Sequence, residues 1–162
     1  MLDIGGASGL FVKYLTPEIN PFVLDISLGM CVQARKNQIV KTVCADAEKL
    51  PFKSNSFDSV TSLEMIYYLE NPQGFINEVE RILKSDGVLT LSFYNSKLNF
   101  VVRIRSFLRR LKLSRMFFDD GNPTFTSLDD FHKYIKLTNF EIIKIESEEI
   151  VFEKNYFSMI YF

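Results

Sequence analysis

Short apolar segments alternate with helical segments along the first 95 residues, and this alternation restricts the fold more than any other feature of the chain. The predicted strands are 1–4, Phe22–Ile26, Ile39–Cys44, Phe57–Leu63 and Val88–Tyr94. The predicted helices, one after each of the first, second and fourth strands, are Ser8–Leu15, Ser27–Arg35 and Pro72–Lys84. Repeated strand–helix units predict an α/β fold with a doubly wound, mostly parallel sheet and helices on both faces.

The two ends of the chain differ from this regular pattern. The first strand keeps only residues 1–4, so we expect an N-terminally truncated domain. After the fifth strand we expect a helix at Ser127–Leu137, then a strand at Phe140–Glu146 and an antiparallel C-terminal strand at Tyr156–Phe162.

Length and composition indicate one globular domain over residues 1–162. Hydrophobic residues make up 47% and charged residues 24% of the chain, which excludes a disordered or fibrous protein. The net charge of −1 selects no class of partner. No uncharged apolar run approaches the length of a bilayer-spanning helix. We expect Cys31 and Cys44 to be buried, reduced thiols in a cytoplasmic protein, with a disulfide as the lesser alternative.

A glycine-rich segment, Asp3–Gly9, lies between the first strand and the first helix. Small residues at such a turn allow close approach of a ligand to the backbone, and Asp25, 20 residues after Gly5, is placed to accept hydrogen bonds from ribose hydroxyls. Each feature alone has a simpler explanation. The glycine-rich segment also fits an ordinary tight turn, and Asp25 also fits an acidic residue that flanks a helix. The spacing matches neither a dinucleotide fingerprint nor a P-loop, so the pattern favours a nucleoside ligand without a pyrophosphate.

Five motifs in register resemble those of the class I S-adenosylmethionine-dependent methyltransferases, in the group that includes small-molecule and quinone methyltransferases. Ala7 replaces the middle glycine of the first motif, D-x-G-x-G-x-G. The motifs are Asp3–Gly9, Val23–Ser27, Cys44–Phe52, Ser56–Val60 and Glu78–Gly87. They extend from residue 2 to about residue 95. The resemblance implies a Rossmann-like methyltransferase fold.

S-adenosylmethionine is the cofactor that this resemblance implies. Asp25 is expected to accept from the ribose and Asp46 from the adenine amine, while Ile26 and Met30 sandwich the base. Ordinary core packing is the alternative for either apolar residue alone. The full set of expected cofactor-binding residues is Asp3, Gly5, Gly6, Ala7, Gly9, Asp25, Ile26, Met30, Asp46, Ala47 and Leu63.

The acceptor side is less defined by the sequence. We expect a small-molecule or lipid-like acceptor, and Glu64, Tyr67 and Tyr68 are the substrate-side candidates because they follow the fourth strand. Packing is an equal explanation for the tyrosines. No catalytic base is assigned and no metal site is expected, and the single histidine, His132, fits a surface or structural role best.

A basic stretch, 97–115, holds seven Lys or Arg residues and no acid, and helical spacing makes it amphipathic. We interpret 97–123 as a basic substrate-side insertion. A solvated basic face, an anionic acceptor and a peripheral contact with an anionic membrane are the open alternatives, and the absence of any RNA-binding motif disfavours nucleic acid. The alternative function for the whole chain is a non-catalytic ligand-binding or interaction domain that retains the fold.

Overall fold

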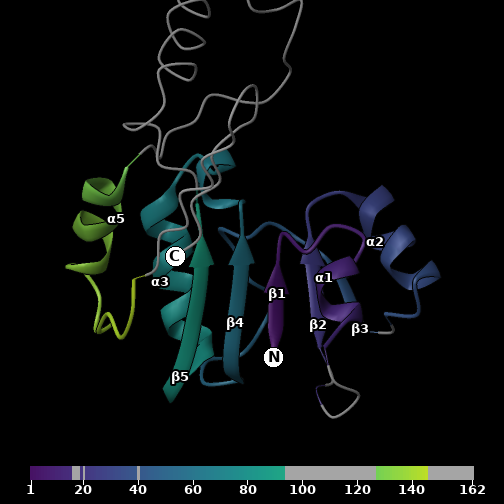
Figure 1. Cartoon of the computed structure of the whole chain (residues 1–162), viewed down its shortest axis with the longest axis horizontal. Helices are drawn as coiled ribbons and strands as arrows, with labels where there is room; N and C mark the ends of the chain where they lie inside the picture. The colour runs from purple at the N-terminus through teal and green to yellow at the C-terminus, as the bar shows by residue number, and fades with distance from the viewer. Residues whose placement is uncertain (16–18, 20, 40, 94–126, 146–162) are drawn as a thin grey trace, which may run out of the picture.

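The computed structural model describes residues 1–15, 19, 21–39, 41–93 and 127–145, and in this part five strands form one sheet (Figure 1). The strand order is β3-β2-β1-β4-β5, and all four neighbouring pairs are parallel. The strands are β1 (Leu2–Ile4), β2 (Phe22–Asp25), β3 (Lys41–Cys44), β4 (Phe57–Leu63) and β5 (Leu83–Ser92). The helices are α1 (Leu10–Lys13), α2 (Leu28–Lys36), α3 (Pro72–Ile82) and α5 (Leu128–Ile135), with a 3-10 turn η1 (Ile66–Tyr68).

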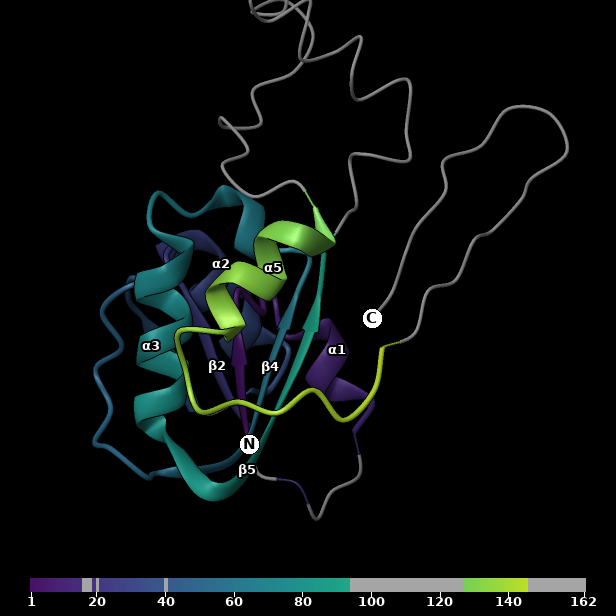
Figure 2. The same cartoon turned by 90° about the vertical axis from the view of Figure 1, so that its left-hand side faces the viewer.

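The core is divided between the two faces of this sheet. Figure 2 shows α3 and α1 on opposite sides of the strands. Leu2, Ile4 and Leu24 pack in the larger cluster on the α3 side, whereas Val23 packs with Val12 of α1 in the smaller one, which Ala34 of α2 completes. Side chains alternate between faces along each strand, which is why neighbouring residues enter different clusters. The doubly wound arrangement predicted from the sequence is therefore confirmed.

Side-chain caps fix where three of the helices begin. The Ser27 hydroxyl accepts from the Met30 N–H at 3.4 Å, and the Asn71 side chain accepts from the Gly74 N–H at 2.9 Å. Ser127 caps α5 in the same way. Caps of this kind satisfy N–H groups that have no partner within the helix. The predicted starts near Ser27, Pro72 and Ser127 agree with the structure to within one residue.

The first helix is shorter than predicted, and only one of its side chains is buried. Ser8–Leu15 was expected, but Gly9 has a φ of 73° and the helix begins only at Leu10 and ends at Lys13. A left-handed residue cannot lie inside a right-handed helix, so the turn continues through Gly9. Val12 of this helix is buried, whereas Leu10, Phe11 and Tyr14 are exposed.

Three further expectations need correction within the described residues. The strand β5 begins at Leu83 and not at the predicted Val88, because Leu83 already pairs with Phe57 and the register then shifts to pair Val88 with Ser59. The predicted strand Phe140–Glu146 is not observed over 140–145, where the backbone follows β5 and α5 without forming a strand. Cys44 is exposed because it ends β3 at the open edge of the sheet, while Cys31 is buried; both are free thiols.

Two predicted features lie outside the described residues. These are the basic insertion 97–123 with its amphipathic stretch 97–115, and the C-terminal strand Tyr156–Phe162. The antiparallel strand and the membrane contact therefore stay predictions. In the part of the chain that the structure describes, no helix combines the length and the apolar character needed to cross a bilayer.

An ion pair on α3 holds the loop that connects β3 to β4. Glu78 accepts from the Leu50 N–H at 2.9 Å, and Arg81 donates to the Leu50 carbonyl at 3.0 Å and the Phe52 carbonyl at 2.7 Å. Arg81 also donates to Glu78 at 2.8 Å, which holds the pKa of the Glu78 carboxyl below its usual range. The loop that carries Asp46 and Ala47 is thus fixed against α3 by charged groups.

Replacing Arg81 by methionine is expected to lower the free energy of unfolding by about 1–2 kcal/mol. The variant loses hydrogen bonds from a charged donor to two loop carbonyls, but partial exposure reduces the effect. Chemical denaturation measures the change. The matched variant Lys84→Met breaks the exposed pair between Lys84 and Asp58 and should lose much less. Equal losses in the two variants would show that the Arg81 contacts add no specific support.

Candidate functional site

The glycine-rich turn crosses the carboxyl edge of the sheet between β1 and α1, where Figure 1 shows it passing over the end of β2. The N–H of Gly5 donates to the Leu24 carbonyl at 2.8 Å, which ties the turn to the neighbouring strand. Gly5 and Gly9 both have a φ of 73°, and Ala7 has a φ of 48°. Left-handed conformations favour glycine, so the backbone explains the glycines at both ends of the turn and the strain at Ala7.

Close packing gives the turn a second reason to lack side chains. A Cβ on Gly5 would lie 2.6 Å from Cγ of Met65, and one on Gly6 would lie 2.5 Å from Oδ2 of Asp3. Met65 follows β4, and Asp3 is the middle residue of β1. The turn is therefore closely packed at Gly5 and Gly6, while Gly5, Gly6 and Ala7 all remain partly exposed.

Asp25 is the side chain that joins this turn to the next strand. It ends β2, and its Oδ2 accepts from the Ala7 N–H at 3.0 Å while its Oδ1 accepts from the Ser27 N–H at 2.8 Å. A carboxylate oxygen accepts two hydrogen bonds, so each oxygen keeps one free position. Asp25 thus shapes the turn and retains the capacity to bind two hydroxyl groups.

Apolar side chains beside Asp25 are unusually open to solvent. Ile26 is 74% exposed and Met30 is 45% exposed, so neither belongs to the core that was their alternative explanation. Nearby, Asp46 accepts from the Glu48 N–H at 2.8 Å through Oδ1 and stays exposed. Ala47, in contrast, is buried in the larger core cluster. The exposed surfaces fit a flat, partly apolar ligand with a polar edge.

Asp3 lies beneath the turn rather than on its surface. It is 2% exposed, its Oδ1 accepts from the Thr61 hydroxyl at 2.9 Å, and its Oδ2 has no hydrogen-bond partner. Burial raises the pKa of the Asp3 carboxyl to about 6, although the hydrogen bond from Thr61 acts in the opposite direction. Gly6 lies directly above Oδ2, so Asp3 supports the turn from below.

The acceptor-side candidates gather where β4 ends. Leu63 is half-buried at the last position of β4, Glu64 follows it, and Tyr67 and Tyr68 lie in η1. The Tyr67 hydroxyl donates to Glu64 Oε2 at 3.2 Å, and the two tyrosine rings are 4.6 Å apart. Sequence reasoning missed Ser92, which donates to Glu64 Oε1 at 3.1 Å, because nothing local distinguishes a serine within a predicted strand.

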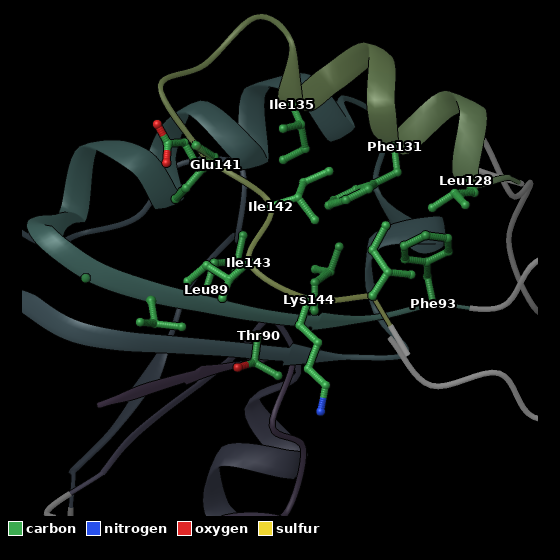
Figure 3. A pocket seen from close by; sticks show the side chains of 15 residues that line it. Leu89, Thr90, Phe93, Leu128, Phe131, Ile135, Glu141, Ile142, Ile143 and Lys144 are labelled. Carbon is green, nitrogen blue, oxygen red and sulfur yellow. The ribbon is translucent and has the colours of Figure 1, made fainter. Parts of the chain in front are cut away.

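A separate cavity lies along β5, away from these residues. Its walls are β5, α5 and the segment 140–145, and Figure 3 shows mainly apolar side chains pointing into it. None of the expected cofactor-binding residues lines it. His132 lies half-buried on α5 with its ring 6.3 Å from that of Phe131, which agrees with a structural role. In the described residues no group of three or more His, Cys, Asp or Glu side chains is arranged to hold a metal ion.

The sheet order, the glycine-rich turn and Asp25 together define a class I S-adenosylmethionine-dependent methyltransferase fold. The family described as "Methyltransferase domain" matches residues 2–91, which is more than half of the chain. The chain therefore belongs to the methyltransferase domain family, and S-adenosylmethionine is the cofactor of its class. The resemblance noted in the sequence is confirmed at this level.

Two curated relatives and one solved structure illustrate the similarity. The bifunctional biotin biosynthesis protein BioHC of Saccharophagus degradans is 32% identical, over 91% of this chain and 27% of the relative. The mitochondrial arginine-hydroxylase NDUFAF5 of Danio rerio is 26% identical, over 92% of this chain and 47% of the relative. A Thermotoga maritima structure, described as a S-adenosylmethionine-dependent methyltransferase and possible histamine N-methyltransferase, has a TM-score of 0.69 and 26% identity over 87% of this chain and 63% of its own. The chain spans less than two thirds of each.

Proposed function

We propose that this chain binds S-adenosylmethionine at the carboxyl edge of the sheet and transfers its methyl group to a small-molecule acceptor. One observation carries the proposal: the Asp25 carboxylate is fixed by the N–H groups of Ala7 and Ser27 and keeps a free acceptor position on each oxygen. Vicinal ribose hydroxyls offer two donors with the required spacing. The relatives named above in biotin biosynthesis and histamine methylation support a small acceptor.

The remaining residues of the edge fit the parts of this cofactor. The adenine would lie between the exposed side chains of Ile26 and Met30, with its amino group toward the free oxygen of Asp46. The amino-acid part would lie over the turn at Gly5 and Gly6. The bound cofactor supplies an activated methyl group, so the protein's work is to align the acceptor and exclude water.

Two further points concern the cellular compartment and an alternative function. The free thiols of Cys31 and Cys44 fit a reducing compartment such as the cytoplasm. A non-catalytic domain that binds the cofactor is the alternative function, and the chain covers 47% of its Danio rerio relative and 27% of the bacterial one. Release of S-adenosylhomocysteine from S-adenosylmethionine with a panel of acceptors distinguishes an enzyme from such a domain.

Replacing Asp25 by alanine is expected to weaken binding of S-adenosylhomocysteine by about 1–3 kcal/mol, or roughly 5- to 150-fold, because charge-assisted hydrogen bonds are lost. Isothermal titration calorimetry measures the affinity. Asp58→Ala is the matched control, since Asp58 lies near the opposite end of β4 and pairs with Lys84. Unchanged affinity in the Asp25 variant would remove the basis of the ribose assignment.

A further inference from the structure

Glu64 is a carboxylate at the carboxyl edge of the sheet, and no ion pair within the described residues includes it. It is half-buried, and the adjacent residues Leu63 and Met65 connect it to β4 and to the glycine-rich turn. Cγ of Met65 lies 2.6 Å from the position that a Cβ of Gly5 would occupy. Glu64 is therefore one residue away from a direct contact with the cofactor turn.

Two hydroxyl groups hold the Glu64 carboxylate in one orientation. Ser92 of β5 donates to Oε1 at 3.1 Å, and Tyr67 donates to Oε2 at 3.2 Å. The Glu64 N–H in turn donates to the Ser92 hydroxyl and carbonyl, each at 3.1 Å. Burial, followed by the negative charge of Glu64, raises the pKa of Tyr67 above its usual range, so this hydroxyl stays a donor. Both oxygens keep a free acceptor position.

The backbone and the charge of Glu64 both point to a ligand. Its φ is 54°, a left-handed conformation that non-glycine residues adopt mainly where the surroundings impose it, often at functional sites. The ion pairs found among the described residues join Arg81 to Glu78, Lys84 to Asp58 and Lys133 to Asp130, and none includes Glu64. Two neutral hydroxyl donors hold Glu64, and no cationic side chain of the described residues forms an ion pair with it.

Aromatic rings complete the surroundings of this charge. The Tyr67 and Tyr68 rings are 4.6 Å apart at an angle of 51°, and Tyr68 is 56% exposed. A carboxylate next to accessible tyrosine rings is the combination that binds organic ammonium groups, through an ion pair and the negative faces of the rings.

We propose that Glu64 binds a cationic amino group of the acceptor, and that Ser92 and Tyr67 are positioning residues that orient its carboxylate. This inference rests on the proposed function, because it takes the carboxyl edge of the sheet as the site of methyl transfer. In this proposal the amino group serves to bind the acceptor, and the proposal does not assign the atom that receives the methyl group.

The test compares two probes of nearly equal shape, 2-phenylethylamine and 2-phenylethanol, by NMR titration of the protein at pH 7 with and without S-adenosylhomocysteine. The amine is cationic and the alcohol is neutral. We expect the parent chain to bind the amine about tenfold more tightly than the alcohol. Glu64→Gln should reduce amine affinity to that of the alcohol and leave the affinity for the alcohol unchanged.

Two further variants test the positioning role of Tyr67 and control for the loss of a negative charge at another site. Tyr67→Phe should lower the preference for the amine without altering the affinity for the alcohol, a result that simple loosening of the turn would not give. Glu70→Gln, an exposed neighbour, should keep the full preference. Circular dichroism checks that each variant remains folded.

Three outcomes would overturn the assignment: equal affinity of the parent for the two probes, a preference retained by Glu64→Gln, or a tenfold or greater loss of S-adenosylhomocysteine affinity in that variant. The last result would mean that the Glu64 carboxylate binds the amino group of the cofactor and not that of the acceptor. If the parent shows a Glu64-dependent amine preference but no binding of S-adenosylhomocysteine, the amine site stands and the proposed function fails.

Discussion

Replacing Gly5 by valine is expected to weaken S-adenosylhomocysteine binding by about 100-fold or more while the fold is retained. Gly5 has a φ of 73°, where a side chain costs about 1–2 kcal/mol and a β-branched one is especially unfavourable. A Cβ there would also lie 2.6 Å from Met65. The turn must therefore shift or Met65 must move, and either change alters the surface on which the cofactor lies. Domains of this size have about 5–15 kcal/mol of stability, enough to tolerate the strain.

Calorimetry for affinity and thermal unfolding for stability are the paired measurements for this variant. Gly29→Ala is the matched control, because Gly29 lies within α2 and a Cβ there would meet only the Ser27 hydroxyl at 3.7 Å. This control should keep its affinity and gain about 0.5–1 kcal/mol of stability, since alanine favours the helix. If the valine variant bound as tightly as the parent, the turn would have only a structural role.

Replacing Asp3 by asparagine is expected to raise the free energy of unfolding above pH 6, by an amount approaching about 3 kcal/mol. Burial raises the pKa of Asp3 from 3.8 in the unfolded chain to about 6 in the folded one. Between these values the unfolded state loses its proton first, so the stability of the parent falls as pH rises from about 4 to 6. Below pH 4 both states are protonated and the penalty is absent. Asparagine removes the charge and can still accept from Thr61.

Denaturation curves at several pH values measure this effect. The parent should lose stability between pH 4 and 6 relative to the Asp3→Asn variant, and the two should converge below pH 4. Asp86→Asn, at an exposed position, should follow the pH dependence of the parent. Parallel curves for the parent and the Asp3 variant over this range would mean that burial of the carboxylate carries no such cost.

Much of the parallel sheet could be predicted because its strands and helices have clear local signals. The apolar strand β4 was predicted with its observed bounds, Phe57–Leu63, and Ser27 marked the start of α2 by its chemistry. The expected strand at Phe140–Glu146 was wrong over 140–145 because an apolar, β-branched run does not by itself determine whether a segment joins a sheet. The length of α1 was wrong because Gly9 has a left-handed conformation, with a φ of 73°, and the helix begins only after it.

The candidate site could be predicted only in part. The turn and Asp25 were found because glycine spacing and a strand-ending acid form a recognisable pattern. The support of Glu64 by Ser92 could not be found, because it depends on the register that places Leu63 of β4 opposite Ser92 of β5. Similarly, the burial of Asp3 and of Ala47 follows from tertiary packing and has no signal in the local sequence.

Chemical-shift changes of backbone amides on titration with S-adenosylhomocysteine test the position of the cofactor site most directly. Two surfaces compete: the carboxyl edge with the turn, and the apolar cavity along β5. If the cofactor binds at the carboxyl edge, the largest chemical-shift changes occur at Gly5, Gly6, Ala7 and Ile26, with further changes near Asp46. Changes concentrated instead at Leu89, Phe131 and Ile143, or no saturable change at any residue, would show that the glycine-rich turn and Asp25 do not form the cofactor site.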